Sequence, residues 1–113
     1  MKEIKLQEWV YKTRLQIFYD CTFKELKKSY SVINEIEDNW RCGIFVWWDW
    51  WALIWLKDKN DIPCLVHELL HFTFWAMKRR WVYYDYEYSE ETFCYLQEYY
   101  LREFLKKIER LEK

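Results

Sequence analysis

Two histidines stand four residues apart in the segment "HELLH", at His67 and His71. Residues i and i+4 share one face of an α-helix, so both imidazoles can bind one ion, and zinc accepts nitrogen ligands at about 2.0–2.1 Å. Glu68 directly follows the first histidine. It would be angled away from the ion but within reach of a water bound to it, whose proton a carboxylate can accept. The segment therefore predicts a zinc site with Glu68 as general base.

A structural explanation competes with this one. The same five residues would fit a buried amphipathic helix whose histidines bond to the backbone or to each other. A chain of this length matches HExxH by chance well under ~1% of the time. The motif also uses every histidine of the chain. We therefore favour the metal site.

A catalytic zinc site needs a third protein ligand and leaves one position open for water. No third histidine exists, so a carboxylate or a thiolate must serve. The carboxylate candidates after the motif are Asp85, Glu87, Glu90, Glu91 and Glu98. Cys64 lies one turn before His67 and would give a closed site that supports folding instead of catalysis. Cys94 is a further thiol, which we expect to be a small buried filler.

The segments "HELLH" and, after it, "EETFCYL" resemble the gluzincin metallopeptidases, in which a glutamate on the next helix is the third zinc ligand. The chain is more closely similar to small phage-encoded zincin-like proteins, which have a strand pair, an HExxH helix and a final helix opening with Glu-x-x-x-Tyr. This resemblance covers roughly residues 40–105. Only the two quoted segments are specific.

The resemblance implies that His67, His71 and Glu91 are the zinc ligands and that Glu68 is the base. Many gluzincins place an aspartate four residues after the ligand glutamate, where it orients the first histidine. This chain has Tyr95 there, and its hydroxyl would take that orienting role. No residue clearly stabilises the reacting carbonyl oxygen. The tyrosines of the following loop remain open for it, namely Tyr83, Tyr84, Tyr86 and Tyr88.

These residues need elements that position them. Alternation of apolar and polar residues predicts two strands in the first twenty residues, and helical spacing starts near Phe23 behind a capping box of Thr22 and Glu25. The β-branched and aromatic run "GIFVWWDWWALIWL" predicts two strands, roughly at 44–48 and 51–56, with a turn near Asp49. A helix of about 62–79 follows, capped by Asp61, and Ser89 precedes a last helix of about 90–112.

This order predicts an α+β fold. With the resemblance, the expectation is one minimal zincin-like domain over residues 1–113. It would consist of a small antiparallel or mixed sheet packed on three helices, of which the second carries HExxH.

The aromatic run "WWDWWALIW" directly precedes the motif helix. In the zincin-like arrangement, a strand at that position lies at the sheet edge beside the cleft, and a peptide substrate adds to it. The alternative is a heavily packed core whose exposed tryptophans bind a partner or a second copy of the chain.

Charge and composition exclude several classes of function. The net charge is −1 without a basic stripe, so we expect no nucleic-acid partner. The longest apolar run is too short to span a bilayer as a helix, so we expect no membrane partner. The four cysteines form no CxxC pair, which predicts free thiols in a reducing compartment, hence the cytoplasm, or the host cytoplasm if the gene is viral.

The sequence therefore predicts a zinc metallopeptidase, a hydrolase that cleaves a peptide or protein substrate. A zinc-stabilised interaction or inhibitor protein without catalysis, using its aromatic surface, is the alternative.

Overall fold

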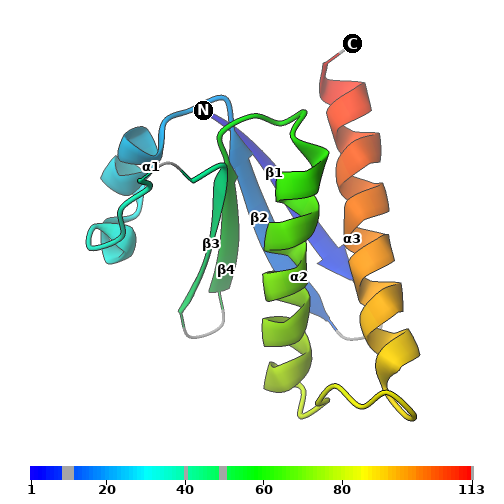
Figure 1. Cartoon of the computed structure of the whole chain (residues 1–113). Helices are drawn as coiled ribbons and strands as arrows, with labels where there is room; N and C mark the ends of the chain where they lie inside the picture. Colours follow the sequence, from blue (N-terminus) through cyan, green and yellow to red (C-terminus); the bar gives the residue numbers. More distant parts are fainter. Residues whose placement is uncertain (9–11, 40, 49–50, 113) are drawn as a thin grey trace.

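A four-stranded mixed sheet, covered by helices, forms the centre of the computed structural model (Figure 1). The structure describes residues 1–8, 12–39, 41–48 and 51–112. The strands are β1 (Lys2–Glu8), β2 (Thr13–Tyr19), β3 (Gly43–Trp48) and β4 (Trp51–Leu56). The helices are α1 (Phe23–Ser29), a 3-10 turn (Ser31–Ile33), α2 (Ile62–Arg79) and α3 (Glu90–Leu111). The α+β class and the element order agree with the prediction.

The strand order is β1-β2-β4-β3. β1 and β2 are antiparallel, as are β3 and β4, whereas β2 and β4 run parallel. The strand directly before the motif helix, β4, is therefore central, and the two edge strands of the described sheet are β1 and β3. This corrects the expectation that the strand directly before the helix lies at the edge. The antiparallel pair of β3 and β4 joins β2 through β4, which leaves β3 outside. Apolar patterning does not specify this choice.

The two faces of the sheet carry separate cores, because successive side chains of a strand point to opposite faces. On one face, Ile17 and Ile54 pack with residues of α2 and α3 such as Leu69. On the other face, Leu53 and Trp55 pack with residues of α1 and the 3-10 turn. In Figure 1, α2 and α3 accordingly lie on one side of the sheet and α1 on the other. The motif helix is thus anchored along its buried stripe, and its remaining faces are free to carry a site.

The local signals at the helix starts are confirmed in part. Thr22 and Glu25 form the predicted capping box. Asp61 caps α2 by accepting the Cys64 amide at 3.1 Å. The hydroxyl of Ser89 makes no cap bond. It instead accepts the amide of Asp85 at 2.7 Å and so closes the loop before α3. The predicted turn at Asp49 lies outside the described residues.

The prediction of four free thiols is wrong for two cysteines. Cys42 and Cys64 form a disulfide, with Cα atoms 6.1 Å apart. The fold brings the start of β3 against the first turn of α2, and the 22-residue separation hides this proximity in the sequence. A Cβ on Gly43 would meet the Cys64 sulfur at 2.9 Å, so glycine is required there for this approach. Cys21 and Cys94 are free, and Cys94 is exposed, not buried as expected.

Within the described residues, no helix is long and apolar enough to cross a membrane.

Candidate metal and hydrolase site

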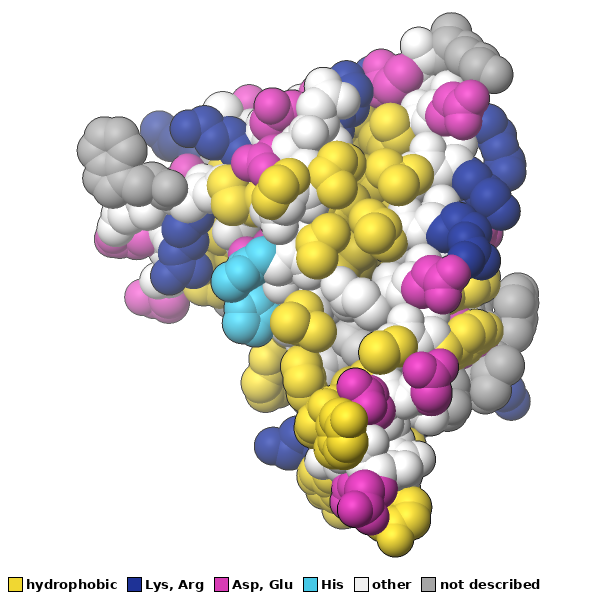
Figure 2. All heavy atoms as spheres, turned by 45° about the vertical axis from the view of Figure 1, so that its right-hand side comes forward, with side chains coloured by type: hydrophobic (Ala, Val, Ile, Leu, Met, Phe, Trp, Pro, Cys, Tyr) yellow, Lys and Arg dark blue, Asp and Glu magenta, His cyan; other side chains and the backbone are white. Residues whose placement is uncertain are grey.

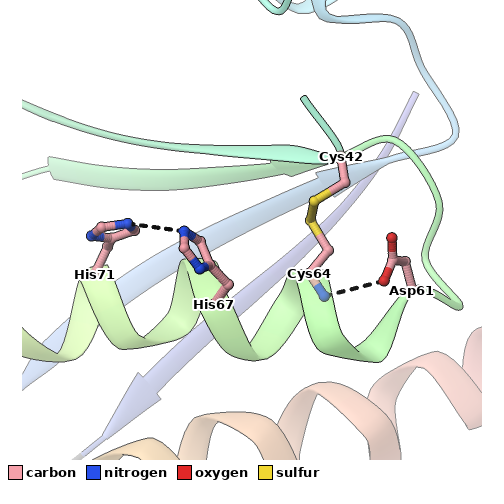
Figure 3. The surroundings of a disulfide bond; sticks show 5 residues. All are labelled: Cys42, Asp61, Cys64, His67 and His71. Carbon is pink, nitrogen blue, oxygen red and sulfur yellow. Dashed lines mark hydrogen bonds between the residues drawn. A yellow bond between two sulfur atoms is a disulfide. The ribbon is translucent and has the colours of Figure 1, made fainter. Parts of the chain in front are cut away.

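Both histidines lie on the side of α2 that faces β3 (Figure 3). The ring of His71 stacks on Phe45 of β3, with ring centroids 6.5 Å apart and planes 6° from parallel. The two histidine Nε2 atoms approach each other to 3.3 Å. The helical spacing therefore brings the imidazoles together, as the sequence predicts.

This spacing suits one zinc ion. Two nitrogens bound at 2.0–2.1 Å in tetrahedral geometry lie roughly 3.3–3.4 Å apart. The histidine Nε2 atoms are 3.3 Å apart without rearrangement. The distance also suits a hydrogen bond between the rings, which is one of the structural explanations of the motif. The structural explanation also expects the histidines to be buried, and this expectation fails because both histidines are exposed.

A cleft of about 720 Å³ lies in front of the histidine pair. One wall is the chain that leads into β3 and the first half of that strand, and the other wall is the first half of α2. The cleft is lined by Arg41, Cys42, Gly43, Ile44, Phe45, Asp61, Pro63, Cys64, His67, Glu68 and His71. A substrate in this cleft would contact both the histidine pair and an edge strand.

Glu68 lies in the same cleft and is only 7% exposed. Among the described residues, no hydrogen bond or ion pair engages its carboxylate. No fully enclosed polar side-chain atom of the described residues lacks a partner. The Glu68 oxygens therefore keep contact with the open space of the cleft, where a carboxylate can accept a proton from water.

The structure does not bring Glu91 to the histidine pair. Glu91 is exposed in the first turn of α3. Among the described residues, one group of three potential ligands has its ligand atoms within 4.8 Å of one another, and it consists of Cys42, Asp61 and Cys64. The Glu91 carboxylate therefore does not lie that close to both imidazoles. α3 meets α2 away from the histidines, where Gln97 donates to the carbonyl of Val66 at 3.1 Å. Two of the three predicted ligands are thus adjacent.

Tyr95 also lies apart from the histidines. Its hydroxyl donates to Oε1 of Glu8 at 3.2 Å, at the end of β1. The four loop tyrosines considered for the reacting oxygen are exposed and do not line the cleft. The structure therefore places no described tyrosine beside the histidine pair.

Sequence reasoning missed the polar residues on the β3 side of the cleft. Arg41 and Cys42 precede β3 and line the cleft beside Glu68. Their proximity to α2 depends on the β3–β4 pairing, and no motif announces it. The glycine at position 43 was the available signal, since a single glycine in a dense aromatic chain indicates a close backbone approach.

A hydrophobic surface borders the histidines (Figure 2). On α2, Val66, Leu70 and Phe74 follow at helical spacing and are all exposed. Trp81 is 82% exposed directly after the helix.

No protein-family model, no curated protein and no solved structure matches the chain.

Proposed function

We propose that the chain is a zinc-dependent peptide hydrolase in which His67 and His71 hold the ion and Glu68 is the general base. The observation that carries the proposal is the 3.3 Å approach of the two Nε2 atoms in a cleft that also contains Glu68. A bound zinc ion would polarise the substrate carbonyl and make water more acidic. Glu68 would accept the proton of the attacking water and pass it to the leaving amine.

A peptide is the substrate that this cleft suits best. β3 pairs only with β4 and leaves its other edge without a strand partner among the described residues. An extended peptide can add to such an edge through main-chain hydrogen bonds. The cleft contains Phe45 at the middle of β3, beside His71. This arrangement would bring a peptide bond along β3 toward the histidine pair.

Glu91 remains the proposed third ligand, on the strength of the "EETFCYL" resemblance alone. Tyr95 remains the residue proposed to orient a histidine on the same ground. These two assignments are separable from the histidine pair, so they need their own variants.

Metal content tests the ligand set. With the Cys42–Cys64 disulfide intact, we expect about one zinc per chain in the wild type, loss of the metal in His67→Ala and weaker retention in Glu91→Ala. Glu35→Ala is the matched control, because Glu35 is an exposed glutamate outside the cleft. Full retention of zinc in His67→Ala would refute the site. Full retention in Glu91→Ala alone would refute only the third ligand.

Hydrolysis tests the reaction. Zinc-loaded protein should cleave members of a mixed peptide library, and Glu68→Gln should slow cleavage by about 10²–10⁴-fold, the usual contribution of a general base. The variant keeps the size of the side chain, so zinc content and melting temperature should stay unchanged. Equal cleavage by Glu68→Gln and wild type would contradict the proposal.

A non-catalytic interaction protein is the second candidate, and Trp81 is the observation that favours it. Trp81 follows α2 with φ 62, in the left-handed region where glycine is usual. It is largely exposed, so the fold gains little from its size. Backbone strain is found preferentially at functional sites, and a large exposed aromatic side chain can contact a partner. Binding of a partner that survives Glu68→Gln but not Trp81→Gly would support this function.

A further inference from the structure

A second group of potential metal ligands lines the same cleft. The ligand atoms of Cys42, Asp61 and Cys64 all lie within 4.8 Å of one another. Figure 3 shows Cys42 at the start of β3 above the first turn of α2, where Cys64 and the capping Asp61 are placed. We call these three residues the thiol–carboxylate cluster.

The fold builds this cluster from three sides. Gly43 leaves room for the Cys64 sulfur, which a Cβ would approach to 2.9 Å. Asp61 is fixed by its N-cap bond, in which Oδ1 accepts the Cys64 amide at 3.1 Å. The other oxygen, Oδ2, has no hydrogen bond among the described residues. Cys42 is exposed, Cys64 is buried, and both line the cleft.

We propose that the thiol–carboxylate cluster, once reduced, is a binding site for a borderline-soft divalent metal ion such as zinc or cobalt. These ions accept both thiolate and carboxylate ligands, and a fourth position would be left for water. The site is distinct from the histidine pair. The ring nitrogens of His67 and His71 do not belong to the close group, although His67 lies one turn after Cys64.

The disulfide decides whether this site exists. Its sulfurs are bonded to each other and cannot act as thiolates. An external dithiol would reduce the bond by two electrons, so that each protein sulfur gains a hydrogen and the dithiol becomes a disulfide. Metal binding would then release the two thiol protons to solvent. The oxidised chain should therefore bind no metal through these residues.

Cobalt absorption tests the site without relying on the proposed hydrolase function. We would use the full chain carrying His67→Ala and His71→Ala, which lacks the histidine pair, reduced with a phosphine that leaves no competing thiol. We expect about one Co²⁺ per chain and thiolate-to-cobalt absorption in the near ultraviolet. The oxidised protein should show no such absorption. If the reduced protein shows none, the proposal is wrong.

Variants in the same background identify the ligands. Cys42→Ser and Cys64→Ser should each abolish the thiolate absorption. Asp61→Asn keeps a residue able to cap the helix but removes the charge, and should weaken Co²⁺ binding by about tenfold or more. The control replaces the two other cysteines, Cys21→Ser with Cys94→Ser, and should leave the absorption unchanged. Persistence of the absorption in either Cys42→Ser or Cys64→Ser would overturn the assignment.

A measurement on the unmodified chain guards against variants that fail to fold. Zinc added to reduced wild-type protein should slow alkylation of Cys42 and Cys64, detected by peptide mass spectrometry. Cys94 is exposed and free, so its alkylation rate should not change. If zinc leaves the alkylation rates of Cys42, Cys64 and Cys94 all unchanged, the site is refuted.

Discussion

Two buried glutamates of this protein have opposite surroundings. Glu8, at the end of β1, is 1% exposed, and its Oε1 accepts a hydrogen bond from the hydroxyl of Tyr95. Glu68, on α2, is 7% exposed, and its carboxylate has no hydrogen bond or ion pair among the described residues. Glu8 belongs to a hydrogen-bonded network with Tyr95, Tyr100 and Thr13, which we call the bonded network. Glu68 instead faces an open cleft beside two histidines.

Burial of a carboxylate is unfavourable unless other groups compensate for the lost water. The neighbours of Glu8 provide this compensation, and their hydrogen bonds explain its role in the fold. Nothing in the packing explains why a glutamate should occupy position 68. A residue that the fold does not need, placed where it can act on a ligand, is a candidate for function. The comparison therefore separates a structural carboxylate from a functional one.

The largest expected effect is on the bonded network. The hydroxyl of buried Tyr100 donates to the carbonyl of Thr13 at 2.6 Å, lies 2.7 Å from the Thr13 hydroxyl and accepts the Glu8 amide at 3.2 Å. Tyr100→Phe would leave these groups unpaired, and each unpaired buried group costs about 1–3 kcal/mol. We expect a loss of about 2–4 kcal/mol in the free energy of unfolding, measured by urea titration.

Zinc content provides the control for this variant, because Tyr100 does not line the cleft. The Tyr100→Phe protein should bind as much zinc as the wild type. A destabilisation under about 0.5 kcal/mol, the size usual for surface substitutions, would show that the network contributes little.

A matched pair of substitutions tests the comparison itself. Glu8→Leu removes the acceptor of the Tyr95 hydroxyl, and bonds to a charged group contribute about 1.5–3 kcal/mol. Glu68→Leu removes no such bond and adds apolar surface, so its stability should change by less than about 0.5 kcal/mol or rise. Peptide cleavage should show the reverse order. Glu68→Leu should be inactive, whereas Glu8→Leu should cleave peptides under conditions in which it is folded. Equal destabilisation by both substitutions would remove the distinction.

Local signals predicted most of the fold. Asp61 and the basic residues Lys78 and Arg79 give helix bounds that agree with α2, because capping and helix-dipole preferences act within one turn. Alternation similarly located the strands, whose buried positions include Ile4 and Leu6. The first helix ends at Ser29, and a 3-10 turn continues the buried stripe to Ile33.

The site was predictable only where one helix contains it. His67, Glu68 and His71 lie within two turns, so their relation follows from helix geometry. The third ligand depends on how α3 packs against α2, and the disulfide depends on how β3 pairs. Both are tertiary relations, and no residue near Glu91 or Cys42 encodes them locally. The edge position of β3 is a tertiary relation of the same kind, and the local sequence does not specify it.

Alkaline pH gives the smallest expected effect and acts on the bonded network alone. Burial raises the pKa of Tyr100 well above its usual value, whereas in the unfolded chain the tyrosine ionises near pH ~10. Above that pH the unfolded state holds fewer protons than the folded state, so stability falls as pH rises, by up to about 1.4 kcal/mol per pH unit. Tyr100→Phe lacks this contribution, and its stability should fall less steeply.

Urea titrations between about pH 9 and pH 11 measure the difference. Burial also raises the pKa values of Tyr19, Tyr30 and Tyr99, so both proteins should lose stability in this range. The gap between wild type and Tyr100→Phe should nevertheless narrow as pH rises, because only the wild type must keep Tyr100 protonated. Parallel curves would mean that the Tyr100 hydroxyl ionises as easily in the folded protein as in the unfolded chain, and the network would then be open to water. The same titrations on Glu68→Leu should run parallel to wild type, since that substitution leaves the Tyr100 network intact.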